Sequence, residues 1–454
     1  MTIDSTTGSS CAALSHEIRA LCEITSEVIK YSRARGATAA ECGVSEGIGQ
    51  TVKVRCGDVE TIKHNHNKRI GITVYLNYRR GHASTSDFSL SAVRATVDAA
   101  MSIARSTAQD QWAGLPDAVM LAREIPDLDL FHPWDLSIKE AIDIANTCES
   151  AAFSVDDGIN NSQGASVSVQ HSQGVFGNSL GFLAGYPRSL HWISCAVIAG
   201  SGTTMQRDSW HSSARRAADL DSPVLVGQIA GRRAISRLGA KRITTMQAPV
   251  IFEAPVAASL LSHFVTAASG GNLYRKASFL LDTLGLEIFS PLVNISENPH
   301  ILRGLASGPF DGEGVASRQR CVVQDGVLQG YFLGSYSARK LGMKTTGNSG
   351  HSFNLNLKPT TGDLSSLIRQ MRRGLVVTEL MGQGVNLVNG DYSRGAAGYW
   401  VENGEIAYPV TEVTIAGNLK DIFRGIVAVG SDVLYRGSNH CGSILVEEMI
   451  IGGQ

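Results

Sequence analysis

Helical and strand-like spacings of apolar residues alternate along the first part of the chain. Apolar residues recur at steps of three and four in residues 13–35, and Gly36 follows, which predicts an amphipathic helix that ends there. The same helical spacing returns in residues 89–108. Between these helices, residues 41–86 contain the runs "QTVKVRCG", "VETIKHN" and "RIGITVYLN", which predict short strands. The first lobe, residues 1–112, is therefore predicted to be helix, strands, helix.

A connector separates this lobe from a second one. Residues 113–136 contain three prolines and show no sustained periodicity. Ser137 then offers an N-cap for a helix that runs to about residue 154. The strand-like runs "ASVSVQHS", "VFGNSLGFLAGY" and "SLHWISCAVIAG" follow, and a helix with Pro223 in its first turn comes next. This pattern predicts a second α+β lobe over residues 137–241.

The remainder, residues 242–454, opens with a helix and then carries hairpin signals. Asp325-Gly326 and Asn403-Gly404 each separate alternating apolar runs, and such dipeptides supply the positive φ angles of a two-residue turn. The whole chain is thus predicted to be an α+β protein. Two N-terminal α/β lobes, each built as helix, strands, helix, precede a β-rich C-terminal domain with many hairpins.

Composition narrows the classes of function. The chain has 40 basic and 41 acidic residues and a net charge of −1, without long runs of either sign, so direct binding to nucleic acid or to a membrane surface is not expected. The beginning of the chain lacks a signal-peptide pattern, and no uncharged apolar run reaches the roughly 18 residues of a membrane helix, so we expect a cytoplasmic protein. The eight scattered cysteines suggest neither a zinc ribbon nor a disulfide framework.

Three short motifs suggest chemistry, and each also has an ordinary structural explanation. Ser179 in "GNSLG" matches the hydrolase pattern G-x-S-x-G, but it lies between two strand-like runs rather than before a helix, which favours a β-turn. His64 and His66 would point the same way from a strand and could share a metal, yet no third ligand follows by spacing. Asp311 and Glu313 could orient a peptide amine or a cation, or could be solvated acids in a glycine-bounded turn.

The helix within "VAASLLSHFVTAASGG" tests for metalloprotease chemistry. Leu260, Leu261 and Phe264 form one apolar face, which leaves Ser262 and His263 on the other side. A zinc-peptidase helix needs two neutral imidazoles that reach one Zn²⁺ and a glutamate beside the first of them as general base. This helix has one histidine and no glutamate.

Long stretches of the last domain carry a specific pattern. They are "PVIFEAPVAASLLSHFVTAASGGNLYRKASFLLDTLG", "GLASGPFDGEGV", "YSARKLGMKTTGNSG", "GLVVTELMGQGVNLVNGDYSRGAAGYWVENGEIAYPVTEVTIAGNLKDIF" and "CGSILVEEMIIGGQ". Together these stretches resemble the TldD/PmbA family, and more narrowly its PmbA branch, also called TldE. The resemblance covers essentially all of the last domain, and the first two lobes agree with the family in order and size.

The resemblance implies a peptidase of two subunits in which the other subunit holds the zinc. In this family TldD carries an H-E-x-x-x-H motif and a further cysteine ligand, and it pairs with PmbA/TldE to trim unfolded peptides. The two histidines of the motif fall on Ser262 and Ala267 here, and its glutamate falls on His263. We therefore expect no catalytic residue and no metal ligand in this chain. Cys441 lies in the region of the TldD cysteine, and its role stays open.

The resemblance further implies that this chain shapes a peptide cavity while a TldD-like partner carries the zinc. His263, Asp311, Glu313 and Arg394 are the candidate contacts to the peptide, and no cofactor is expected in this chain itself. The alternative is a non-enzymatic, homodimeric peptide-binding or regulatory protein, in line with an older label of the family, modulator of DNA gyrase. The first hypothesis also allows a homodimer when the partner is absent.

Overall fold

The computed structural model describes residues 14–453, which fold into two compact units. The first unit runs to Ile235 and includes the short segment Gly312–Ala316, which returns to it from the second half of the chain. The second unit comprises Ser236–Asp311 and resumes at Ser317. Both units mix helices with strands, which confirms the predicted α+β class. Within the described residues, no helix combines the length and the apolar character that crossing a membrane requires.

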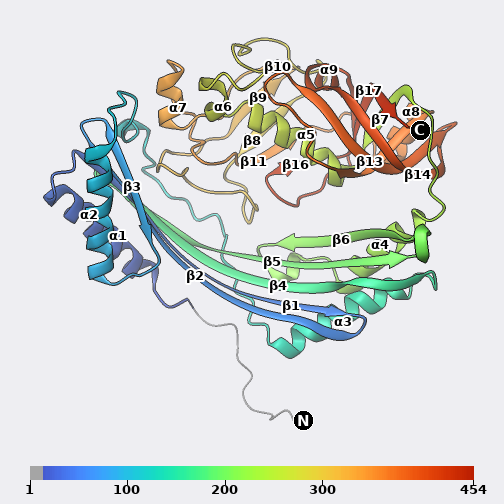
Figure 1. Cartoon of the computed structure of the whole chain (residues 1–454), viewed down its shortest axis with the longest axis horizontal. Coiled ribbons are helices and arrows are strands. Elements are labelled where there is room, and N and C mark those ends of the chain that lie inside the picture. Colours follow the sequence, from blue (N-terminus) through green and yellow to red (C-terminus); the bar gives the residue numbers. More distant parts are fainter. Residues whose placement is uncertain (1–13, 454) are drawn as a thin grey trace, which may run out of the picture. The chain divides into compact units, whose positions relative to one another are not determined.

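One antiparallel sheet forms the centre of the first unit, with the strand order β3-β2-β1-β4-β5-β6 (Figure 1). Its strands are β1 (Ala39–Arg55), β2 (Asp58–Leu76), β3 (Arg79–Thr85), β4 (Ile159–Asn178), β5 (Leu183–Ala199) and β6 (Gln206–Ala214). The helices are α1 (Ile18–Ala34), α2 (Leu90–Ser106), α3 (Ile138–Phe153) and α4 (Pro223–Ser236), with 3-10 turns η1 (Ala118–Met120), η2 (Gly202–Thr204) and η3 (Ala217–Asp219). Because β1 pairs with β4, the two predicted N-terminal lobes share this sheet.

The strands of this sheet are longer than the sequence pattern predicted. The runs "VETIKHN" and "RIGITVYLN" are two parts of the single strand β2, which has 19 residues. The prediction of short strands was wrong here because the first half of β2 is polar and mostly exposed, so no apolar alternation marks its continuity. In the same way, the run "VFGNSLGFLAGY" spans the end of β4, a turn and the start of β5.

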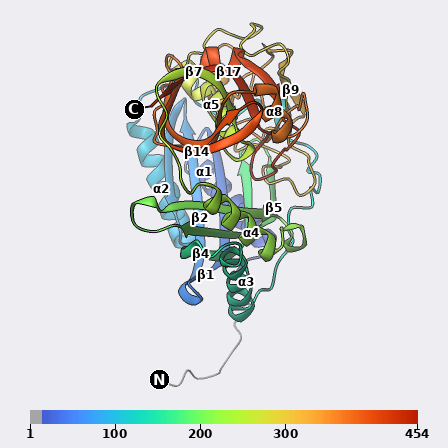
Figure 2. The same cartoon turned by 90° about the vertical axis from the view of Figure 1, so that its right-hand side faces the viewer.

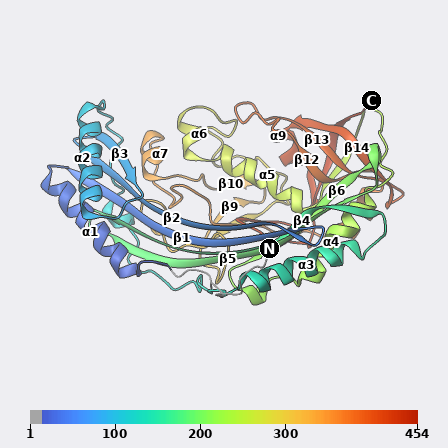
Figure 3. The ribbon, with the colours of Figure 1, turned by 60° about the horizontal axis from the view of Figure 1, so that its bottom comes forward.

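The helices of the first unit cover one face of the sheet, because apolar residues alternate along its strands. Ala40, Cys42 and Val44 of β1 pack with α1 and α2 at one end of the sheet. Cys195 of β5 lies beside Cys148 of α3 at the other end, and α4 packs against α3. Figures 1 and 3 show the two helix pairs at opposite ends of the sheet. The other face, called the open face below, carries the intervening polar residues.

Two sheets make up the second unit. One has the strand order β10-β9-β8-β11-β16, and the other the order β14-β13-β12-β7-β17-β15. Since β17 also pairs with β14, five strands of the second sheet close into a ring, part of which is visible in Figure 2. The strands are β7 (Met246–Phe252), β8 (Ile295–Asn298), β9 (Arg320–Gln324), β10 (Val327–Leu328), β11 (Asn354–Leu357), β12 (Gly374–Met381), β13 (Asp391–Glu402), β14 (Glu405–Asn418), β15 (Ile426–Val429), β16 (Asn439–His440) and β17 (Ile444–Gly452). The helices are α5 (Ala254–Ala267), α6 (Gly270–Tyr274), α7 (Ser335–Lys340), α8 (Leu364–Met371) and α9 (Leu419–Arg424).

The local turn and cap predictions are confirmed. Asp325-Gly326 joins β9 to β10, and Asn403-Gly404 joins β13 to β14. All four turn residues have positive φ angles, of 47° and 79° in the first turn and 52° and 80° in the second. Ser137 caps α3 through a reciprocal capping box with Glu140. The helix predicted over residues 13–35 corresponds to α1, although residue 13 lies outside the described part.

A buried carboxylate on β1 ties the start of α1 to the sheet. The Glu46 side chain is 0% exposed and accepts hydrogen bonds from the backbone N–H groups of Ser15 and His16, both at 3.1 Å. His66 Nε2 of β2 lies 2.8 Å from the same carboxylate. Burial raises the pKa of Glu46, but the hydrogen bonds outweigh burial and lower that pKa to about 2.

Folding stability should therefore depend on the ionised Glu46. Since the pKa is depressed in the folded state, the carboxylate stabilises the fold above its ordinary pKa of 4.5, and this contribution is lost as the pH falls from there to about 2. We expect Glu46→Gln to lower the unfolding free energy at pH 7 by roughly 1–3 kcal/mol and to flatten its decline in acid, measured by urea unfolding. Glu23→Gln on exposed α1 is the control. Equal acid slopes for Glu46→Gln and wild type would contradict this assignment.

Candidate functional site

Helix α5 is held by the burial of its apolar side in the core of the second unit. Glu253 precedes the helix and Pro255 lies in its first turn, where the fixed φ of proline suits a helix start. Leu260 is 2% exposed and Phe264 is fully buried. The Phe264 ring meets that of Phe289 edge to face, with 5.2 Å between the centroids. This packing sets the direction in which the three positions of the zinc motif point.

Ser262, at the first motif position, connects α5 to β16. Its hydroxyl donates to the carbonyl oxygen of Ala258 at 3.1 Å and accepts from Asn439 Nδ2 at 2.8 Å. The Asn439 side chain also donates to the same carbonyl oxygen, at 3.2 Å. Because both hydrogen-bonding roles of the hydroxyl are used, Ser262 serves as a contact between two elements.

His263, at the second motif position, packs against β13. Its ring lies edge-on to Tyr392, with 6.0 Å between the centroids. Burial lowers the pKa of His263, and the Arg394 guanidinium lowers it further, so the imidazole is neutral at pH 7. Burial also raises the pKa of Tyr392 to about 12, against the opposing effect of Arg394. The His263 ring is half-buried between α5 and β13.

The residues at the motif positions do not fit a zinc ion. Ala267 is fully buried and has no donor atom, while Ser262 is already paired. The one imidazole, of His263, faces the positive charge of Arg394, which opposes a second cation. Burial is the main cause that raises the pKa of the Cys441 thiol to about 12, and the Asp432 carboxylate adds to it. Residues 14–453 contain no group of three or more His, Cys, Asp or Glu side chains arranged to hold a metal.

Asp311 and Glu313 belong to different units of the chain. Asp311 belongs to the second unit, is 2% exposed and accepts a hydrogen bond from the backbone N–H of Ser349 at 2.8 Å. Glu313 belongs to the first unit, where its charge acts on Glu41. Burial of the Glu41 carboxyl is the main cause that raises its pKa to about 7, and the charge of Glu313 adds to this effect. The chain passes from one unit to the other between them, which the spacing in sequence does not reveal.

Ser179 and His66, from the other two motifs, form hydrogen bonds within the first unit. Ser179 lies in the turn between β4 and β5, as predicted, and its hydroxyl accepts a hydrogen bond from the backbone N–H of Ala40 at 3.0 Å. His66 contacts the buried carboxylate of Glu46, as described above. The partner of His66 is therefore the neighbouring strand β1, and the histidine helps to hold that strand pair together.

Two residues of the α5 site escaped the sequence prediction. Tyr392 and Arg394 are two positions apart on β13, so the period of a strand could have placed both side chains on one face. Asn439 offers no such signal, since its partner Ser262 lies 177 residues away and only the fold brings the two together.

Comparison with known proteins identifies the family of the chain. Family models described as the first, central and C-terminal domains of the PmbA/TldA metallopeptidases match residues 40–104, 131–238 and 245–453. The metalloprotease PmbA of Escherichia coli O157:H7 is 48% identical over 415 residues, which cover 91% of this chain and 92% of that protein. The chain belongs to the PmbA branch of the PmbA/TldD family. A PmbA homologue of Haemophilus influenzae is 43% identical, and the match covers 98% of both chains.

Solved structures agree with membership of the PmbA/TldD family. A Bacteroides thetaiotaomicron protein described as a candidate modulator of DNA gyrase has a TM-score of 0.90 and 25% identity, covering 95% of this chain and 98% of its own. TldE of Thermococcus kodakarensis shares the fold, with a TM-score of 0.81 and 19% identity, and the match covers 95% of this chain and all of that one. The resemblance found in the sequence is thus confirmed at the level of family and fold.

The coupling between Arg394 and His263 can be measured directly. We expect Arg394→Gln to raise the pKa of His263 towards its ordinary value, because one of the two causes that lower it is removed. The chemical shift of the ring Cε1 proton, followed against pH by NMR, reports this pKa. Arg373→Gln, which removes a guanidinium stacked on Trp400, is the control. An unchanged titration in Arg394→Gln would show that this charge does not act on the imidazole.

Proposed function

We propose that this chain is the PmbA/TldE-like subunit of a cytoplasmic metallopeptidase that degrades or processes unfolded peptides. In this proposal a TldD-like partner carries the zinc, and this chain shapes the cavity in which the peptide lies. The observation that carries the proposal is helix α5, whose apolar side is buried while the motif positions Ser262, His263 and Ala267 do not form a zinc site. Hydrolysis by this chain alone would lack the metal that activates water.

The four candidate peptide contacts have different parts in this proposal. His263 and Arg394, both only partly buried, would face the peptide from α5 and β13, with the cation suited to carbonyl and carboxylate oxygens. Glu313 is partly exposed and stays a candidate contact to the peptide. Asp311 is almost fully buried, so its part would be to hold the segment around Ser349 in place.

Metal analysis combined with a cleavage assay tests the division of labour. We expect the purified chain to contain far less than one zinc per molecule and to leave an unfolded peptide intact. After mixing with a TldD-like subunit, we expect zinc-dependent cleavage that exceeds the sum of the separate activities. Stoichiometric zinc in the chain alone, or no gain on mixing, would contradict the proposal. Peptide binding by a stable homodimer without cleavage in any mixture would favour the alternative, a non-enzymatic regulator.

A substitution at Arg394 tests its contact with the peptide. Loss of a charge-assisted hydrogen bond costs roughly 1.5–3 kcal/mol, so we expect Arg394→Ala to lower kcat/KM of the mixed complex by about one to two orders of magnitude. Arg424→Ala, which removes a bond to the carbonyl oxygen of Glu287, is the matched control. Thermal unfolding of both variants shows whether the second unit stays folded. Equal kcat/KM values for the two variants would remove Arg394 from the peptide site.

A further inference from the structure

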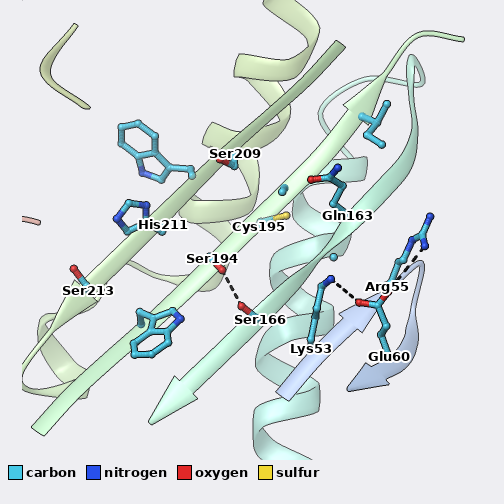
Figure 4. Close-up of a pocket in the computed structure, with 15 residues that line it drawn as sticks. Lys53, Arg55, Glu60, Gln163, Ser166, Ser194, Cys195, Ser209, His211 and Ser213 are labelled. Atoms are coloured by element: carbon cyan, nitrogen blue, oxygen red, sulfur yellow. Dashed lines mark hydrogen bonds and ion pairs between the residues drawn. The ribbon is translucent and has the colours of Figure 1, made fainter. Parts of the chain in front are cut away.

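The open face of the first unit contains a cavity that the α5 site does not involve. It has a volume of about 850 Å³, and all its lining residues belong to the first unit. Figure 4 shows the side chains that line it, which extend from β1, β2, β4, β5 and β6. Ala196 and Gly164 leave room at the floor, whereas Trp192 is a large residue of the lining. The cavity is thus a trough that crosses several strands.

A row of polar side chains runs across the strands within this trough. Lys53 of β1 pairs in register with Ser166 of β4, Ser166 with Ser194 of β5, and Ser194 with His211 of β6. The Ser166 and Ser194 hydroxyls are 2.8 Å apart and hydrogen-bonded (Figure 4). Four adjacent strands span about 14 Å, the length of roughly four residues of extended peptide. Hydroxyls can both donate and accept, so this row suits the alternating N–H and C=O groups of a peptide backbone.

Positive charge predominates at the rim of the trough. Glu60 is bonded to Lys53 at 2.5 Å and lies 3.9 Å from Arg55, so one carboxylate faces two cations. Arg207 of β6 adds a third cation, whose guanidinium donates to the amide oxygen of Gln163 at 3.3 Å. The nearby acid Asp208 is paired with Arg233 of α4 on the helix-covered side of the sheet. The rim therefore has a surplus of cations and complements a negatively charged ligand.

We propose that this trough binds an acidic, extended segment of a peptide. Its carboxylates would be held at the rim by Lys53, Arg55 and Arg207, its backbone by the serine row, and an apolar side chain by the partly exposed indole of Trp192. This inference rests on the proposed function in that it names the class of peptide that the complex takes. It adds a preference for acidic sequences, which the α5 site does not predict.

Binding to the chain alone tests this preference. An unstructured peptide rich in aspartate, labelled with an uncharged dye, is compared by fluorescence anisotropy with its asparagine isostere at low salt. We expect the acidic peptide to bind at least about tenfold more tightly, since several exposed ion pairs each contribute up to about 1 kcal/mol, and the difference should shrink at high salt. Equal affinities for the two peptides would overturn the proposal.

Charge-removal variants locate the binding. The triple variant Lys53→Gln, Arg55→Gln and Arg207→Gln should lose about tenfold or more in affinity for the acidic peptide and keep its weaker affinity for the isostere. The matched control removes three exposed cations from the helices, by Lys30→Gln, Lys139→Gln and Arg232→Gln. Equal affinities of the two triple variants for the acidic peptide would overturn the proposal.

One further variant and one modified peptide separate the possible explanations. Ser209→Trp fills the trough from exposed strand β6 without changing charge, and it should weaken binding of both peptides. Amidation of the peptide C-terminus shows whether the bound carboxylate is terminal or belongs to aspartate side chains, and either source supports the proposal.

If the mixed complex cleaves both peptides equally well and the chain alone does not distinguish them, the proposed function stands and this inference fails. If the chain alone prefers the acidic peptide but no mixture cleaves it, the trough stands and the proposed function fails.

Discussion

The burial of one side of α5 determines what the rest of the second unit can do. Phe264 and Leu260 anchor the helix in a core to which both sheets contribute, and Phe264 meets Phe289, Phe332 and Phe423 edge to face. A buried aromatic cluster of this kind allows the helix neither to rotate nor to slide, because either motion would open cavities or create clashes. The residues on the remaining side are therefore held in fixed directions, whatever their chemistry. The position of the helix therefore does not depend on the chemistry of its remaining side chains.

The side chains on that remaining side form contacts within the unit where a zinc peptidase would place ligands. Ser262 is occupied by Asn439, and His263 is kept neutral by burial and by Arg394. A neutral imidazole beside a fixed cation can interact with carbonyl or carboxylate oxygens, whereas zinc binding would require the same region to accept a second positive charge. A guanidinium at this place suits an oxygen-bearing group, whereas activation of water would need a metal.

Features of the fold that depend on neighbouring residues could be predicted from the sequence, whereas features that depend on contacts between distant residues could not. The Asn403-Gly404 turn and the Ser137 cap depend on residues adjacent in sequence, so their predictions were confirmed. The length of β2 was missed because its exposed half lacks the alternation that burial imposes. The pairing of β1 with β4, which joins the two predicted lobes in one sheet, follows from contacts between residues more than a hundred positions apart.

The candidate sites likewise combine positions that local sequence predicts with contacts that only the fold creates. Helical periodicity placed His263 on α5, but its burial against Tyr392 requires β13, and the separation of Asp311 from Glu313 requires knowledge of where the chain changes unit. The trough was not predicted at all, because Lys53, Ser166, Ser194 and His211 are single polar residues on four strands and become a row only through register.

The near-zero net charge of the chain is compatible with a preference for acidic peptides. At physiological ionic strength, charges act over about 8 Å, so a ligand responds to the few groups that line its site rather than to the whole protein. With 40 basic and 41 acidic residues in total, this chain exerts little long-range attraction on either sign of charge. A surplus of cations confined to the rim of one trough can therefore select a peptide segment without drawing nucleic acid to the surface, because a polyanion gains most from a basic area larger than this one.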